Sequence, residues 1–454
     1  MKSAWSLALY GSVFVSVSAL GASSDSDFTG RWEVTTSYPG SSYVAGLDLS
    51  TDKEKVTGRS GWLVPDWAVF YYNGTWENRT LHLKITYKDG SDIGEITVKS
   101  ARGTLSGTGT IHGIAVTLVG QRPAPRPTSP TVHTFEPHIY YRSFSGANPP
   151  ALHIFPGDTV RTKTVDAGGD DEHDVPRSLP QNPQTGPFYI EAAMPGDTIA
   201  VHFNKIRLNR DTASQSRGEL SPRVLPPGYK QEAPKDWSSI WKLDRVQGTA
   251  TPDKPSDKLK NFKVKLIPML GCVGVAPYWN LSNASADLGQ YGGNMDYNQI
   301  VEGTTLYLPV YQAGALLTVG DGHALQEDGE ITGNGLETSM DVEFTVDLLP
   351  SQLLDQPWAE NDEYIMVSGI GGSLGEALQI ATAGLSNWLK SYYQLNSAEV
   401  ATVLASSIHY DIATVVDPRV HVVAKIKKEA LSQIPKPDKP SDMFCQAWWG
   451  CKID

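Results

Sequence analysis

The feature that most constrains the fold is an alternation of apolar and polar residues that recurs between residues 26 and 120. In "LHLKITY" (81–87) the apolar side chains fall on one face, and His82, Lys84 and Thr86 fall on the other. "GIAVTLVG" (113–120) repeats the pattern, and turn sequences such as "YKDGSD" separate such runs. A period of two between turns indicates β-strands. We therefore predict an antiparallel β sandwich or barrel for this region.

A proline-rich stretch, "QRPAPRPTSPTVHTFEP" (121–137), interrupts this pattern and favours an extended connector. A chain of 454 residues is expected to form two or three domains. The all-β region has no cluster of acids or histidines suited to catalysis, which indicates a binding or stabilising role. We predict a signal peptide at 1–22, an all-β accessory domain at 23–120, a linker at 121–136, a second domain at 137–440 and a cysteine-containing tail at 441–454.

The second domain is predicted to be mainly β with a late helical pair. "FPGDTVRTKTVD" (155–166) and "MPGDTIAVHFNK" (194–205) each read as a turn that starts an alternating strand. Ser373 and Glu376 form a capping-box pattern before one apolar run with helical spacing, and Asn396 and Glu399 do so before a second. The domain is therefore expected to have α+β character.

The N-terminus, "MKSAWSLALYGSVFVSVSALGA", has a lysine, an apolar run and then small residues, as a secretory signal does. Sequons at four asparagines support export weakly, and two cysteines near the C-terminus could form a disulfide in an oxidising compartment. These residues are Asn73, Asn78, Asn280 and Asn283, and Cys445 and Cys451. The net charge of −12, without a cluster of Lys or Arg, argues against nucleic acid or an anionic membrane surface as the partner.

Two glycine-rich acidic segments are the strongest candidates for a functional site. They are "GQYGGNMDYNQIVEG" (289–303) and "VGDGHALQEDGEITGNGLE" (319–337). Asp321 and His323 are two apart behind an apolar strand, so they point to the same side if the strand continues. A carboxylate beside an imidazole suits a divalent metal such as zinc or an oriented general base. A charged surface hairpin is the alternative.

These segments resemble the signature of the acetamidase/formamidase family. The resemblance lies in "GCVGVAP", "GGNMD" and "EGTTLYLPVYQAGALLTVGDGHALQEDGE", with "NPQTGPFYIEAAMPGDTIAV" and "VDAGGD" upstream, and covers about residues 137–435. It implies hydrolysis of small linear amides to carboxylate and ammonia, a β-rich fold, one bound divalent metal (zinc first) and homo-oligomers. Glu327 departs from the family pattern, because many members have Gly at this position.

The resemblance also suggests roles for the site residues. Asp321 and His323 would be metal ligands or would orient water, with Asp166 as a third ligand. Glu191 or Glu330 would carry the proton, and Asn294 would donate to the oxyanion. The residues expected to bind the substrate are Asp296, Gln326 and Glu337.

Two rival functions remain open from the sequence. One is a secreted, non-catalytic β protein that binds a carbohydrate or small ligand through its first domain. The other is the same amidase-like fold acting on a different C–N bond, such as that of a lactam. The long proline-rich insertion "NKIRLNRDTASQSRGELSPRVLPPGYKQEAPKDWSSIWKLD" (204–244) is expected to cover the pocket.

Overall fold

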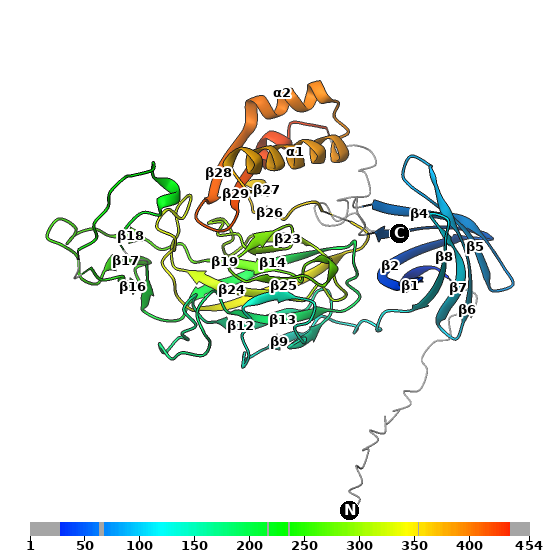
Figure 1. Cartoon of the computed structure of the whole chain (residues 1–454), viewed down its shortest axis with the longest axis horizontal. Coiled ribbons are helices and arrows are strands. Elements are labelled where there is room, and N and C mark those ends of the chain that lie inside the picture. The colour runs from blue at the N-terminus through cyan, green and yellow to red at the C-terminus, as the bar shows by residue number, and fades with distance from the viewer. Residues whose placement is uncertain (1–27, 63–67, 216–217, 235–236, 353, 436–454) are drawn as a thin grey trace, which may run out of the picture.

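The structure, a computed structural model, describes residues 28–62, 68–215, 218–234, 237–352 and 354–435. The predicted signal peptide and the pair Cys445 and Cys451 lie outside these ranges. Within them, no helix combines the length and the apolar character that crossing a membrane requires. Figure 1 shows the N-terminal domain at one end of the long axis and a small four-stranded sheet at the other.

The first domain is a closed antiparallel barrel, as the alternation predicted. Its strands follow one another in sequence, and β1 closes the barrel by pairing with β8, with Glu33 opposite Gln121. Leu81 and Ile85 are fully buried while Lys84 between them is exposed, so the apolar face fills the interior. The strands are β1 (Gly30–Tyr38), β2 (Ser41–Asp52), β3 (Lys55–Trp62), β4 (Ala68–Glu77), β5 (Thr80–Thr86), β6 (Asp92–Ala101), β7 (Thr104–Ile111) and β8 (Ile114–Gln121).

The second domain is built on two large sheets whose facing sides form the main core. Phe188 of one sheet contacts Phe344 of the other, with ring centroids 5.3 Å apart. The six-stranded sheet has the order β11 (Leu152–Ile154), β13 (Gln184–Ile190), β24 (Leu317–His323), β19 (Met269–Gly274), β22 (Gly292–Asn294) and β21 (Leu288–Gly289). The nine-stranded sheet has the order β28 (Ile408–Thr414), β29 (Val420–Lys427), β27 (Tyr364–Gly371), β26 (Trp358–Glu360), β23 (Thr305–Pro309), β14 (Thr198–Leu208), β25 (Met340–Leu349), β12 (Thr159–Thr164) and β9 (Val132–Thr134).

The strand β9 lies inside the predicted linker, yet it pairs in parallel with β12, with Val132 opposite Thr159. The second domain therefore starts before residue 137. Two smaller sheets complete it. They are the pair β10 (Ser143–Ser145) with β20 (Ser282–Ala284), and a four-stranded sheet of β15 (Thr212–Ser214), β16 (Ile240–Asp244), β17 (Thr249–Pro252) and β18 (Val264–Lys265).

The helices α1 (Leu374–Tyr392) and α2 (Ser397–Ser407) form the predicted late pair, and α1 packs on β27 and β29. Ser373 caps α1 by accepting from the backbone N–H of Glu376, and Asn396 and Glu399 form the expected capping box of α2. A short α3 (Lys428–Leu431) and the 3₁₀ turns η1 (Pro222–Val224) and η2 (Tyr278–Asn280) are the remaining helical elements of the described residues.

The barrel is joined to the second domain by a buried ion pair. Arg31 of β1 binds Asp197 in the turn before β14, and its Nε donates to the carbonyl of Ala192 at 3.1 Å. The same guanidinium contacts Asp48 of β2 at 3.0 Å, and the hydroxyl of Ser351 also donates to Asp48 at 2.6 Å. This junction fixes the position of the barrel against the second domain.

A candidate metal centre

Four buried side chains meet at the end of β24. The Nε2 atom of His323 lies 3.2 Å from Oε2 of Glu337, 3.5 Å from Oδ1 of Asp321 and 3.9 Å from Oδ1 of Asp296. These four side chains are at most 5% exposed. Two further carboxylates, those of Glu330 and Asp417, offer ligand atoms to the same cluster. We call these six residues the acid cluster.

The four facing atoms of this group have no hydrogen-bond partner among the described residues. They are Oδ1 of Asp296, Oδ1 of Asp321, Nε2 of His323 and Oε2 of Glu337. Buried carboxylates without partners are costly, because like charges repel and burial disfavours ionisation. Three carboxylate oxygens within 3.9 Å of one imidazole nitrogen are a set of donor atoms that a divalent cation takes. The residues present therefore fit a metal ion.

The orientation of His323 is fixed from its other side. Its Nδ1 lies 2.8 Å from Oε1 of Gln326, whose amide nitrogen donates to the carbonyls of Asp296 at 2.6 Å and Ala413 at 3.3 Å. The Gln326 oxygen can only accept, so Nδ1 carries a proton and Nε2 faces the carboxylates. A partner that holds the second ring nitrogen of a metal-binding histidine is a usual feature of such sites.

A chain of two amides holds the carboxylates. Nδ2 of Asn182 donates to Oδ1 of Asn294 at 2.6 Å and to Oδ2 of Asp321 at 3.1 Å. Nδ2 of Asn294 donates in turn to Oδ2 of Asp296 at 2.6 Å and to Oδ1 of Asp417 at 3.2 Å. Asp296 and Asp321 each have one oxygen held in this way, and the other oxygen faces Nε2 of His323. The second oxygen of Asp417 accepts from the hydroxyl of Thr414 at 2.8 Å.

The local backbone has unusual conformations at three of the acids. Asp296, Asp321 and Glu330 have φ angles of 42°, 55° and 50°, in the left-handed region that side chains other than glycine rarely adopt. Such conformations persist only where the surroundings enforce them, and they concentrate at functional sites. Gly271 on β19 leaves the necessary room, since a Cβ there would lie 2.3 Å from Oδ1 of Asp296 and 2.7 Å from Oδ2 of Asp321.

Burial and mutual repulsion shift the protonation of the acid cluster. Burial raises the pKa of Asp296 and of Glu330 well above the usual range, and neighbouring carboxylates add to both shifts. Burial raises the pKa of Glu337 to about 7 against the opposing effect of His323. Burial disfavours the charged form of His323, but Glu337 and Asp321 outweigh it and raise that pKa well above its usual value. A cation would replace the protons that the metal-free cluster retains.

Three solved structures share the fold of the second domain. One is a predicted acetamidase/formamidase from Thermoanaerobacter tengcongensis, with a TM-score of 0.58 and 26% identity over 68% of this chain and 99% of the other. An acetamidase from Yersinia enterocolitica gives 0.58 and 28% over 68% and 96% of the two chains. An acetamidase from Bacillus halodurans gives 0.57 and 23% over 66% and 99%, a likeness of fold. No curated protein matches the chain.

Residues 286–369 match the model of the Acetamidase/Formamidase family. The second domain therefore resembles proteins of the acetamidase/formamidase family in part of its sequence and in its fold. The matched span contains five of the six residues of the acid cluster. It also contains Asn294 and Gln326, whose amides hold members of the cluster in place. These residues are Asn294, Asp296, Asp321, His323, Gln326, Glu330 and Glu337.

The second domain brings together all of the residues predicted for the active site except Asp166 and Glu191. The carboxylate of Asp166 binds Arg210, which the insertion supplies, and the backbone N–H of Asp170, so both of its oxygens have partners. Glu191 binds Nδ1 of His153 at 2.7 Å. Gln184 of β13 pairs with Gly320, the residue before Asp321. Glu191 comes seven residues after Gln184, just beyond the other end of β13. Glu191 therefore lies roughly 20 Å from the acid cluster along the strand direction.

Sequence reasoning missed Asp417 and Asn182. Asp417 follows β28 in "VVDPRV", where an Asp before Pro reads as an ordinary turn. Asn182 lies in "LPQNPQ" and has a φ of 51°. No local sequence pattern indicates that its side chain reaches the site. Glu327, the departure from the family pattern, is an exposed residue on the loop after β24.

The glycosylation predictions stay predictions. Asn73 and Asn78 are exposed on the barrel, and Asn283 is half-buried in β20. The side chain of Asn280 lies outside what the structure describes.

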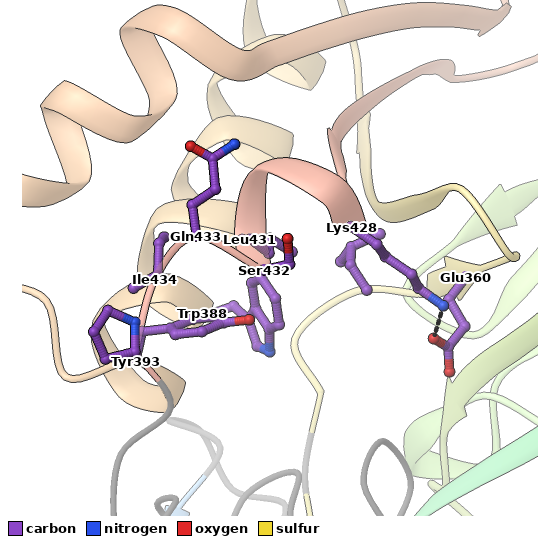
Figure 2. A pocket seen from close by; sticks show the side chains of 10 residues that line it. Glu360, Trp388, Tyr393, Lys428, Leu431, Ser432, Gln433 and Ile434 are labelled. Atoms are coloured by element: carbon purple, nitrogen blue, oxygen red, sulfur yellow. Dashed lines mark ion pairs between the residues drawn. The ribbon is translucent and has the colours of Figure 1, made fainter.

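A separate cavity of about 690 Å³ lies beside α1 and α3, lined by apolar groups such as Trp388, Tyr393 and Leu431 (Figure 2). Its charged groups satisfy one another. Nζ of Lys428 lies 2.7 Å from Oε2 of Glu360, and the hydroxyl of Tyr307 donates to the other oxygen of Glu360 at 2.6 Å. The acid cluster, with its unsatisfied ligand atoms, is therefore the candidate site, although this cavity is larger than the one beside the cluster.

Proposed function

We propose that the acetamidase/formamidase domain hydrolyses linear amides to a carboxylate and ammonia, with one divalent metal, zinc first, held by the acid cluster. The observation that carries the proposal is that unsatisfied carboxylate oxygens of Asp296, Asp321 and Glu337 all lie within 3.9 Å of the unsatisfied Nε2 of His323. The family match and the acetamidases of the same fold support the reaction class. When bound, a divalent cation would activate water and offset the charge that develops on the amide oxygen.

The residues of the chain then have distinct tasks. Hydrolysis joins the oxygen of water to the acyl carbon, breaks the C–N bond and requires a proton on the departing nitrogen. Glu330 is the proposed proton carrier, because it belongs to the acid cluster and also lines the cavity next to it. Gln326 keeps the imidazole of His323 oriented from the opposite side.

Asn294 has a positioning role rather than the predicted role as an oxyanion donor. An amide nitrogen has two hydrogens. In Asn294 these are donated to the carboxylates of Asp296 and Asp417. Neither hydrogen is left for an oxyanion, and Asn294 keeps two of the surrounding carboxylates in place.

The sequence also supports proposals on the setting of the enzyme. Export rests on the signal-like residues 1–22 and on the exposed sequons at Asn73 and Asn78. A homo-oligomer rests on the family resemblance. Both are separate from the catalytic proposal and can fail without it.

His323→Ala tests the proposal. It removes the central nitrogen of the acid cluster, and we expect it to lose bound metal and at least about a hundredfold in kcat/KM for acetamide. Metal content by elemental analysis and ammonia release are the two measurements. His202→Ala, an exposed histidine on β14, is the matched control and should keep both. Unchanged metal content and activity in the His323 variant would remove the acid cluster from the mechanism.

A further inference from the structure

The acid cluster borders a cavity of about 360 Å³ that the proposed reaction on formamide or acetamide leaves largely unused. Gln326 and Glu330 belong both to the surroundings of the cluster and to the wall of this cavity. Gly335, another wall residue, lies directly against His323, since a Cβ on it would be 2.5 Å from Nδ1 of the ring. The cavity thus adjoins the acid cluster through Glu330, and it reaches the Nδ1 side of His323 through Gln326 and Gly335.

The opposite wall comes from the four-stranded sheet and its connections. Trp241 of β16 and Val264 of β18 line the cavity, together with Phe262, whose ring meets that of Trp241 edge to face at 6.2 Å. Trp241 is 8% exposed, and its Nε1 donates to Oε1 of Gln215 at 3.1 Å, so its position is fixed. Phe262 is 46% exposed, which places it at the mouth of the cavity.

This wall is attached to the acid cluster through the backbone. The N–H of Ser214 in β15 donates to the carbonyl of Glu337 at 3.0 Å, and the N–H of Glu337 donates back to the carbonyl of Ser214 at 2.8 Å. The four-stranded sheet therefore cannot shift without moving a proposed metal ligand. That linkage makes the aromatic wall a fixed part of the site.

The chemistry of the lining indicates what occupies the cavity. No Lys, Arg or His of the described residues lines it, while the exposed acids Glu327 and Asp328 stand among its lining residues. An anionic group would be repelled, and an apolar group would find aromatic and aliphatic contacts. A volume of about 360 Å³ falls within the roughly 300–1,000 Å³ of pockets that enclose drug-sized ligands, far more than a formyl or acetyl group fills.

We propose that this cavity binds the acyl group of the substrate, and that the preferred substrates are primary amides with uncharged, apolar acyl groups larger than acetyl. The proposal rests on the amidase function proposed above. The amide carbonyl would lie at the acid cluster beside Glu330, and the acyl chain would extend past Leu336 toward Trp241 and Phe262.

The test is a series of straight-chain amides from acetamide to hexanamide, with ammonia release measured on the metal-loaded full-length chain. We expect kcat/KM to rise about fourfold for each methylene that becomes buried. Phe262→Ala should lower the ratio of kcat/KM for hexanamide to that for acetamide, and Phe262→Leu should restore most of it. Leu259→Ala is the matched control, because Leu259 is a similarly exposed apolar residue that does not line the cavity.

The outcomes separate the two proposals. Acetamide hydrolysis with a kcat/KM that is flat or falls with chain length, or a hexanamide-to-acetamide ratio unchanged in Phe262→Ala, overturns the acyl-cavity proposal and leaves the amidase proposal standing. If no amide is hydrolysed, the amidase proposal fails, and calorimetric titration decides on the cavity. Tighter binding of hexanamide than acetamide, weakened by Phe262→Ala, supports the apolar ligand class. Equal binding overturns it.

Discussion

In the N-terminal barrel each strand pairs with the next one in sequence, and β1 pairs with β8 to close the barrel. By contrast, Asp321 and His323 lie on β24, which pairs with β13 and β19 from distant parts of the chain. The barrel buries apolar side chains such as Leu81, whereas the second domain also buries carboxylates beside an imidazole. The difference shows that local alternation is sufficient for a packed core. A charged site additionally needs register between strands that are far apart in sequence.

Buried charges have partners at the junction between the two domains, but in the acid cluster some of their atoms do not. At the junction, Arg31 binds the carboxylates of Asp48 and Asp197, so the buried groups have partners. In the cluster, the carboxylates of Asp296 and Glu337 face each other across His323 with atoms left unsatisfied. The first arrangement stabilises the fold, and the second is ready for a ligand.

Arg31→Ala is expected to have the largest effect on stability, because it leaves Asp197, 2% exposed, without its cation. Breaking a buried pair from one side costs about 3–5 kcal/mol. Calorimetry should show a lower Tm and a barrel transition separated from that of the second domain. Lys84→Ala, which breaks the exposed pair with Asp92, should change the Tm little, because solvent screens this pair. Equal losses in both variants would show that the junction is not a buried link.

Gly271→Ala should reduce amide hydrolysis about a hundredfold, since a Cβ at this position would displace the carboxylates of Asp296 and Asp321 from the acid cluster. Initial rates of ammonia release and metal content are the measurements. Gly375→Ala on α1 is the control, because a Cβ there meets no atom within 4 Å. A fully active Gly271 variant would mean that the cluster tolerates displacement and is not the site.

Asn182→Ala should weaken metal binding about 10- to 100-fold, because its amide holds Asp321 and Asn294 without belonging to the ligand set. Competition with a chromogenic chelator measures the Kd for zinc. Glu191→Gln changes a residue just after the far end of β13, away from the cluster, and its zinc affinity is expected to match that of the wild type. If Glu191→Gln weakened zinc binding and Asn182→Ala did not, the assignment of supporting residues would be reversed.

The barrel and the helical pair could be predicted from local signals. Alternation placed Leu81 and Ile85 inside, and the cap residues Asn396 and Glu399 placed the start of α2. On α1 the helical spacing was less reliable, because its leucines at 374 and 378 are 46% and 41% exposed.

The site could be predicted only in part. Asp321 and His323 are close in sequence and were found, whereas Asn182 reaches Asp321 across 139 residues. Asp166 was assigned to the metal, but Arg210 from the insertion neutralises it, and no local pattern shows that pairing. Tertiary contacts of this kind decide which of several similar acids can bind a metal.

We propose that amide hydrolysis depends on one divalent cation held by the acid cluster. The most direct measurement strips the full-length protein with a chelator and titrates zinc back while following ammonia release from acetamide and hexanamide. We expect no activity in the stripped protein and recovery in proportion to added zinc, with a break at about one equivalent per chain. Full activity in the metal-free protein would contradict it.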